Sequence, residues 1–242
     1  MNLAIDVGNT FIKTAVFEGG KILEDYKLER KLFLKGIEKI FHQYPDISHA
    51  ILSSVRNLTP REQKALSVFC KIHILSNSSV IPFKNNYTTP QTLGVDRIAL
   101  ITAAFYENAH KNTLIIDAGT CITYDFLSSD GTYYGGAISP GINMRFKALN
   151  TFTAKLPLVE FDTLDDFIGN STHRSIISGV INGTINEIEG VIGQYSKRFK
   201  DLTLILTGGD SEFLSNRLKN SIFANSNFLL IGLNYILELN KY

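Results

Sequence analysis

The apolar residues of the chain form two similar series of short runs. The first series lies at residues 3–7, 11–17 and 22–28, and the second at residues 114–116, 122–127 and 132–138. Turn-forming residues separate the runs, namely Gly8-Asn9-Thr10 and Gly19-Gly20 in the first series and Ala118-Gly119-Thr120 and Asp130-Gly131 in the second. Apolar runs bounded in this way are typical of strands joined by tight turns. The sequence therefore predicts two three-stranded meanders, half a chain apart.

Segments with helical spacing follow each meander. Helices are predicted at residues 31–44, from Thr59 with a capping box completed by Glu62, at 96–108 and at 175–199. In the longest of these helices, apolar residues recur every three or four positions and so share one face. Gly179 and Gly183 lower the intrinsic stability of that helix, and we therefore expect another backbone to pack closely against them.

Strands followed by helices, twice over, are typical of an α/β protein with two related lobes. We assign residues 1–110 to an N-terminal lobe, which carries the first hairpin, and residues 111–242 to a C-terminal lobe, which carries the second. Ligands commonly bind in a cleft between such halves. The predicted fold class is α/β with an interlobe cleft.

Composition and charge exclude several classes of function. Lys plus Arg is 24 and Asp plus Glu is 23, so the net charge is +1, and the concentrated basic run of a nucleic-acid-binding protein is absent from the sequence. The apolar stretch at residues 228–239 is about half the length of a membrane span. Asp6 leaves no room for the apolar part of a signal peptide, and the two cysteines lack metal-ligand spacing. We therefore expect a cytoplasmic protein that binds neither nucleic acid nor membrane.

The first hairpin carries residues suited to the phosphates of a nucleotide. Glycine lets a backbone approach a ligand closely, and backbone N–H groups in such a turn can hold phosphate oxygens. Lys13 adds a point charge, and Asp6 fits beside phosphates if it holds a hydrated Mg²⁺. The candidate phosphate-binding residues are Asp6, Val7, Gly8, Asn9, Thr10, Phe11, Ile12 and Lys13. A plain turn is the alternative for a single loop of this kind, but two copies, at Asp6 and Asp117, favour phosphate binding.

A second candidate site lies at Gly94-Val95-Asp96-Arg97, where a predicted helix begins. A carboxylate in the first turn of a helix is stabilised as the anion. Asp96 is therefore either a helix cap or a base that accepts the proton of a substrate hydroxyl while Arg97 holds an anionic group. These four residues alone leave both interpretations open.

The glycine patterns of the Walker and Rossmann loops are absent from the sequence. The paired Asp-x-Gly hairpins, together with Thr207-Gly208-Gly209, resemble instead the superfamily of actin, Hsp70 and sugar kinases, which implies a ribonuclease H-like fold with ATP between two lobes. Within that superfamily the chain resembles the type III pantothenate kinases. The motifs that carry this resemblance are Asp6-x-Gly8-Asn9-Thr10, Tyr87, Gly94 to Arg97, Asp117 to Thr120, the Gly-Gly-Ala-Ile-Ser-Pro-Gly sequence at 135–141, and Gly169 to Thr172.

The resemblance implies a role for each matching residue. Residues 6–13 and Thr120 would bind ATP, with Mg²⁺ held by Asp6 through water, and Asp117 would hold the monovalent cation, K⁺ or NH₄⁺, that the family requires. Asp96 would accept the proton of the pantothenate hydroxyl. Pantothenate would contact Tyr87, Gly94, Val95, Asp96, Arg97 and Thr172. The resemblance also implies a homodimer with Thr172 near its interface.

The implied function is ATP-dependent phosphorylation of pantothenate to 4'-phosphopantothenate, the first step of coenzyme A biosynthesis. The enzyme would be a phosphotransferase with an alcohol group as acceptor. Two alternatives stay open: a kinase of the same superfamily for another small hydroxyl substrate, and a non-catalytic regulatory homologue. The near-neutral charge and the presence of Asp6, Asp96 and Asp117 argue against a regulator.

Overall fold

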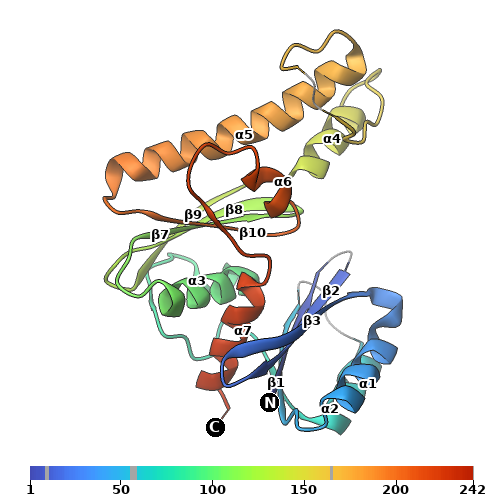
Figure 1. The fold of residues 1–242 in the computed structure, drawn as a ribbon, viewed down its shortest axis with the longest axis vertical. Coiled ribbons are helices and arrows are strands. Elements are labelled where there is room, and N and C mark those ends of the chain that lie inside the picture. Colours follow the sequence, from blue (N-terminus) through green and yellow to red (C-terminus); the bar gives the residue numbers. More distant parts are fainter. Residues whose placement is uncertain (9–10, 55–58, 164–165, 242) are drawn as a thin grey trace. The chain divides into compact units, whose positions relative to one another are not determined.

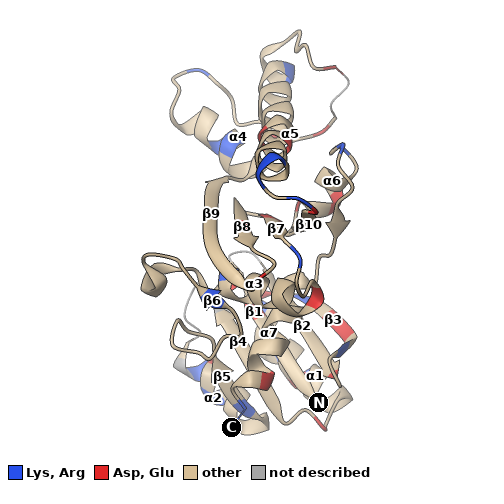
Figure 2. Cartoon of the chain, turned by 90° about the vertical axis from the view of Figure 1, so that its left-hand side faces the viewer, with Lys and Arg blue, Asp and Glu red and all other residues tan. Residues whose placement is uncertain are grey.

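The computed structural model describes residues 1–8, 11–54, 59–163 and 166–241. The chain forms two compact units (Figure 1). Unit 1 comprises Met1–Ala109, Gly131–Tyr133 and Asn227–Tyr242, and unit 2 comprises His110–Asp130 and Tyr134–Ser226. Charged residues of both signs are present in each unit (Figure 2), in keeping with the small net charge.

Unit 1 is built on a five-stranded sheet. Its strands are β1 (Asn2–Val7), β2 (Phe11–Glu18), β3 (Lys21–Glu29), β4 (His49–Ser54) and β5 (Lys71–Ile74), in the order β3-β2-β1-β4-β5. β1, β2 and β3 form an antiparallel meander, while β4 runs parallel to β1 and β5 parallel to β4. The first predicted meander is confirmed.

Alternation of side chains gives this sheet two different faces. Leu3, Ile5 and Val7 of β1 pack into a core with α1 (Phe33–Gln43) and α2 (Pro60–Phe69) on one face. Helices α3 (Val95–Glu107) and α7 (Phe228–Leu239) contact the strands from the other face (Figure 1). The predicted capping box at Thr59 and Glu62 is present. Two single 3₁₀ turns, Arg30–Leu32 and Pro90–Thr92, and the short strand β6 (Lys84–Asn85) complete the unit.

Unit 2 repeats this arrangement around a second central strand. β7 (Thr113–Ala118) pairs antiparallel with β8 (Cys121–Leu127) and parallel with β10 (Thr203–Thr207), just as β1 pairs with β2 and β4. Asp6 and Asp117 hold equivalent positions, next to last in the two central strands. The sheet order is β11-β10-β7-β8-β9-β6, with β9 at Thr132–Pro140 and β11 at Phe223–Ala224. β6 pairs only with the first two residues of β9, which also belong to unit 1.

The long helix α5 (Thr172–Arg198) lies along one face of the unit 2 sheet (Figure 1). It begins three residues before its predicted start because Ser171 caps it, accepting a hydrogen bond from the Arg174 N–H at 3.2 Å. α4 (Ile142–Thr151) packs beside it and α6 (Ser211–Ser215) follows β10. The expected close backbone packing at Gly179 and Gly183 is wrong within the chain, since a Cβ at either position meets no described atom within 4 Å.

The last helix, α7, belongs to unit 1, whereas the predicted lobe at residues 111–242 included it. Close helix packing is the reason for this difference. A Cβ added at Gly232 of α7 would overlap the backbone carbonyl of Ala99 in α3. The Asn2 side chain of β1 also donates a hydrogen bond to the Asn234 Oδ1 atom of α7 at 2.8 Å. The C-terminal helix thereby completes the core of the N-terminal sheet.

This packing makes Gly232 a sensitive position. Gly232→Ala should lower the free energy of unfolding by about 1–3 kcal/mol, because the added methyl group forces α7 away from α3. The matched control is Gly190→Ala in α5, where a Cβ meets nothing within 4 Å and stability should rise by up to about 1 kcal/mol. Urea denaturation measures both changes. A Gly232→Ala protein as stable as the wild type would contradict the close contact.

Candidate active site

Gly8 and Phe11 lie close together at the end of the β1–β2 hairpin. The Gly8 N–H donates to the Phe11 carbonyl oxygen at 3.1 Å, and a Cβ at Gly8 would lie 3.0 Å from that same oxygen, so glycine fits there with least strain. The side chains of Val7 and Ile12 are buried in the core of unit 1, so only their backbone atoms are left to contact a nucleotide. Asn9 and Thr10, which we predicted to bind phosphate, lie outside the described residues.

Asp6, Lys13 and Ser53 lie side by side on the face of the sheet that α3 and α7 cover. Asp6 of β1 is paired with Lys13 of β2 and with Ser53 of β4. Side chains of directly paired residues project from the same face, which is opposite to that of Leu3 and Ile5. The alternation that buries the apolar residues of β1 against α1 therefore also places Asp6 beside Lys13.

The carboxyl group of Asp6 is electrostatically strained. Burial and, to a smaller extent, the nearby negative charge of Asp96 raise the pKa of Asp6 from 3.8 to about 6. Lys13 and the Ser53 hydroxyl act in the opposite direction. Two carboxylates that are close enough to repel one another in a poorly solvated place favour the binding of a proton or a metal cation.

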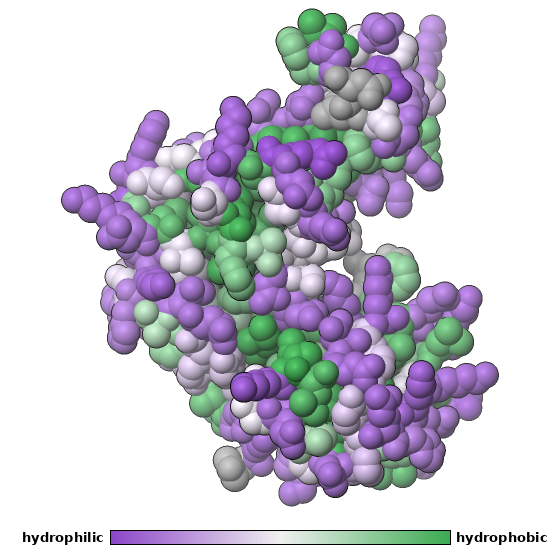
Figure 3. Space-filling view, viewed as in Figure 1, coloured by the Kyte–Doolittle hydropathy of each residue, from purple (hydrophilic) through white to green (hydrophobic). Residues whose placement is uncertain are grey.

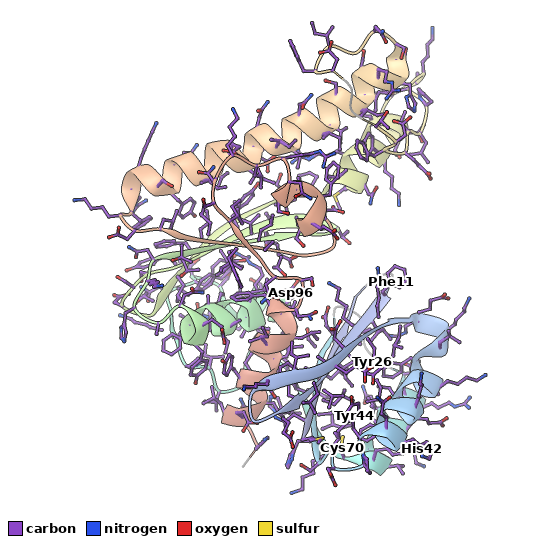
Figure 4. The ribbon with its side chains drawn as sticks, viewed as in Figure 1. Phe11, Tyr26, His42, Tyr44, Cys70 and Asp96 are labelled. Atoms are coloured by element: carbon purple, nitrogen blue, oxygen red, sulfur yellow. The ribbon has the colours of Figure 1, made fainter. Side chains whose placement is uncertain are left out.

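Asp96 is held in place by the first turn of α3. Gly94 is the N-cap of this helix, and a Cβ at Gly94 would overlap the Asp96 Oδ1 atom. The same oxygen accepts a hydrogen bond from the Arg97 backbone N–H at 2.8 Å. The absence of a side chain at Gly94 therefore lets the Asp96 carboxylate fold back over the start of α3 (Figure 4). A negative charge is stabilised at this end of a helix.

Arg97 and Tyr87 form a cluster with Tyr133. The Arg97 guanidinium is buried, donates to the Tyr133 hydroxyl at 2.9 Å and lies 5.5 Å from the centre of the Tyr87 ring. The Tyr87 and Tyr133 rings stack with their centres 6.0 Å apart. The structure thus brings together Tyr87 and Arg97, two of the predicted pantothenate residues. Arg97 directly follows Asp96 in the sequence.

The second hairpin, between β7 and β8, is enclosed by two glycine turns of unit 2. A Cβ at Gly141 would overlap the Gly119 and Thr120 carbonyl oxygens, and one at Gly208 would overlap the Ala118 carbonyl oxygen and Asp117 Oδ1. Gly208 also has a φ of +96°, which favours glycine. β10 ends directly before Gly208 and Gly209, and the turn at Gly208 places backbone atoms against the Asp117 carboxylate.

Thr172 is the first residue of α5 and lines a cavity of about 740 Å³ between α4 and α5. Leu149 and Leu156 provide apolar walls, and Gly179 and Arg145 also face this cavity. Arg145 forms an ion pair with Glu187, which in turn accepts a hydrogen bond from the Tyr124 hydroxyl at 2.9 Å. This network joins β8, α4 and α5 around the cavity.

The predicted site residues therefore fall into two groups, one in each unit. Unit 1 brings together Asp6, Lys13, Asp96, Arg97 and Tyr87, while Asp117, Thr120 and Thr172 belong to unit 2. Groups of three or more His, Cys, Asp or Glu side chains suited to a metal ion are absent from the described part of the chain. Helices long and apolar enough to cross a membrane are likewise absent from it.

Comparison with known proteins gives the family. A sequence model of the type III pantothenate kinases matches residues 2–194. A type III pantothenate kinase of Christiangramia forsetii is 54% identical over 241 residues, which cover 100% of this chain and 99% of the relative. One of Flavobacterium johnsoniae is 46% identical over 233 residues, with 96% of each chain covered. The chain belongs to the type III pantothenate kinase family.

Solved structures agree with this family at the level of the fold. A Campylobacter jejuni protein assigned to the Baf family of transcriptional activators superposes with a TM-score of 0.65 at 22% identity, over 99% of this chain and 98% of its own. A glucokinase from an Antarctic psychrotroph gives a TM-score of 0.51 at 13% identity, with 98% of each chain covered. The predicted α/β fold with two related lobes, shared with the sugar kinases, is confirmed.

Several residues of this pantothenate kinase family member were missed by sequence reasoning. Ser53 reaches Asp6 through the parallel pairing of β1 and β4, and Tyr133 reaches Arg97 from the start of β9. The Arg145–Glu187 pair joins segments far apart in the chain. Only the pairing of distant elements brings these residues together, so no local pattern could have revealed them.

The raised pKa of Asp6 makes stability depend on pH in the protein without metal or nucleotide. Below about pH 4 the carboxyl group is protonated in both the folded and the unfolded chain. As pH rises from 3.8 to about 6 the unfolded chain ionises first, so the folded state loses relative stability. Asp6→Asn removes this loss and should be about 2–3 kcal/mol more stable relative to the wild type at pH 7 than at pH 4.

Denaturation with urea in EDTA, at a series of pH values, measures this difference. Parallel pH profiles for the wild type and Asp6→Asn would mean that the Asp6 carboxyl group is not strained.

Proposed function

We propose that this chain phosphorylates pantothenate with ATP to give 4'-phosphopantothenate, the first step of coenzyme A biosynthesis. The observation that carries the proposal is the 54% identity, over the whole length of the chain, to a protein named as a type III pantothenate kinase. The geometry of unit 1 supports it. Asp96 is close enough to Asp6 to act on its charge, and Asp6 belongs to the β1–β2 hairpin, which we assign to the phosphates. A base beside a phosphate-binding turn is what transfer to a hydroxyl requires.

Asp96 is the group that accepts the hydroxyl proton of pantothenate in this proposal. Phosphoryl transfer passes through a loose transition state, so the hydroxyl has to be oriented more than it has to be deprotonated early. The hydrogen bond from the Arg97 backbone N–H fixes the direction of the Asp96 carboxylate over the start of α3. Tyr87, Gly94, Val95 and Arg97 surround this position, and Arg97 is the partner we assign to the pantothenate carboxylate.

The donor atoms of the chain fit the cations that we propose. Asp6, raised in pKa by burial and by Asp96, suits a hydrated Mg²⁺ because a divalent cation relieves the repulsion between the two carboxylates. Bound with ATP, Mg²⁺ supplies positive charge to the phosphates. The Asp117 Oδ1 atom and the Ala118 carbonyl oxygen both lie close to Gly208. These two oxygens are the ligands that we assign to K⁺ or NH₄⁺. Thr120, in the same hairpin, is assigned to ATP.

A homodimer with Thr172 near its interface forms part of the proposal. α5 carries Gly179 on an exposed surface with space for another chain, and this glycine lines the same cavity as Thr172. Figure 3 shows apolar side chains exposed around the end of α5 that carries Thr172. Exposed large apolar residues of this region are Phe152, Phe167 and Ile168. We place the enzyme in the cytoplasm, where ATP is available.

Substitution of Asp96 tests its role in the reaction. Asp96→Asn keeps the size of the side chain but removes the proton acceptor, so turnover should fall by about 10²-fold or more. The dissociation constant for ATP should change little. Steady-state turnover and ATP titration calorimetry give the two values. Near-normal turnover would remove Asp96 from the mechanism.

Substitution of Asp117 tests the monovalent-cation site. Asp117→Asn lowers the negative charge of the proposed ligand set, so the K⁺ concentration that gives half-maximal activity should rise by about tenfold or more. Activity assays over a KCl series, with choline chloride keeping the ionic strength constant, measure it. An unchanged K⁺ dependence would place the cation elsewhere.

Identification of the product tests the substrate. Purified protein with ATP, Mg²⁺ and K⁺ is incubated with pantothenate and, separately, with a set of small alcohols and sugars. Mass spectrometry should find a phosphorylated product for pantothenate alone. Phosphorylation of another hydroxyl compound in its place would favour the alternative kinase. No product together with salt-sensitive DNA binding would favour a regulatory homologue.

A further inference from the structure

The row of charged residues at Asp6 and Lys13 continues onto the next strand. Lys27 of β3 is directly paired with Lys13 of β2, as Lys13 is with Asp6 of β1. The only irregularity in the pairing of β2 with β3 lies between Val16 and Phe17, further along the strands. Asp6, Lys13 and Lys27 therefore share the face of the sheet that bears α3 and Asp96.

Two ammonium groups in direct cross-strand pairing destabilise a sheet. Asp6 balances the charge of Lys13, and Lys13 lowers the pKa of the Asp6 carboxyl group, against burial and Asp96, which raise it. Lys27 has no such partner among the ion pairs of the described residues. Its neighbour Glu29 pairs with Lys31 at 2.9 Å, and Asp25, which precedes Lys27 on the strand, forms no ion pair with it in the described structure. The row carries one positive charge in excess.

Phe11 directs this excess charge towards the phosphate hairpin. The Lys27 Nζ atom lies 4.1 Å from the centre of the Phe11 ring, a distance typical of a cation–π contact. Phe11 is the first residue of β2, directly after the turn, and is 39% exposed (Figure 4). The exposed Lys27 side chain therefore extends along the sheet towards the start of β2.

We propose that Lys27 is a second ammonium group for the phosphates of the bound nucleotide, placed beside Lys13 and held by Phe11. The proposal rests on the proposed function only in taking a nucleoside triphosphate as the ligand. An ammonium group binds a phosphate oxygen as a mobile point charge, and two of them suit a chain of several phosphates better than one. A bound polyphosphate would remove the repulsion between Lys13 and Lys27. Lys27 then acts in nucleotide binding and Phe11 as its positioning residue.

Calorimetric titration without pantothenate tests the proposal, using ATP and AMP with Mg²⁺ present. Lys27→Met keeps most of the side chain but removes the charge, and it should raise the dissociation constant for ATP about tenfold. Its effect on AMP should be less than about twofold because fewer phosphates reach Lys27. Lys27→Arg should restore most of the ATP affinity. The control is Lys21→Met, at the exposed opposite end of β3 and about 20 Å along the strand, which should bind ATP like the wild type.

Thermal unfolding separates a binding role from a structural one. Without nucleotide, Lys27→Met should melt at or above the wild-type temperature, because it removes a repulsion. The increase in melting temperature on adding ATP should be smaller than in the wild type. A lower melting temperature without nucleotide, an unchanged ATP affinity, or equal losses for ATP and AMP would each overturn the proposal.

Failure of the proposed function gives a different result. A wild-type protein that binds ATP, loses affinity with Lys27→Met and yet leaves pantothenate unphosphorylated would sink the assigned substrate while supporting Lys27. If the wild type phosphorylates pantothenate and Lys27→Met binds ATP normally, the assigned substrate is supported and the role of Lys27 is overturned.

Discussion

The site depends on holding the carboxylates of Asp6 and Asp96 close together where solvent is scarce. Burial and the mutual repulsion of these groups raise the pKa of Asp6 to about 6, so the empty site is destabilised at neutral pH. Lys13, Ser53 and the start of α3 reduce this cost. A cation that arrives with a nucleotide would reduce it further. The strain is therefore linked to ligand binding, and the core that β1 shares with α1 and α7 has to supply the stability that the site gives up.

The same strand arrangement serves two kinds of chemistry. In each unit an aspartate is next to last in a central strand that has one antiparallel and one parallel neighbour. Asp6 faces Lys13, whereas Asp117 faces Thr123, which is neutral. The first hairpin therefore combines positive side chains with a glycine turn, which suits anions. The second combines a carboxylate with carbonyl oxygens beside Gly208, which suits a cation.

Local patterns were enough to predict the two meanders, the helix start at Thr59 and the duplicated aspartates, because turn residues and apolar spacing act over a few positions. They gave the wrong expectation for Gly179 and Gly183, whose tight packing would have to come from outside the chain. They also grouped α7 with the second half, since its contact with Ala99 spans more than half of the sequence. The roles of Tyr87 and Thr172 came from the resemblance to a family, and their side chains alone would not have indicated a substrate.

The most direct test of the account is ADP release by the purified protein, measured with a coupled assay in the presence of Mg²⁺ and K⁺. We expect little ADP without pantothenate, and on its addition a release of ADP that matches the phosphorylated pantothenate one for one. Omission of K⁺ should reduce the rate. An ADP release that does not respond to pantothenate would contradict the central claim that Asp6 and Asp96 serve phosphoryl transfer to this substrate.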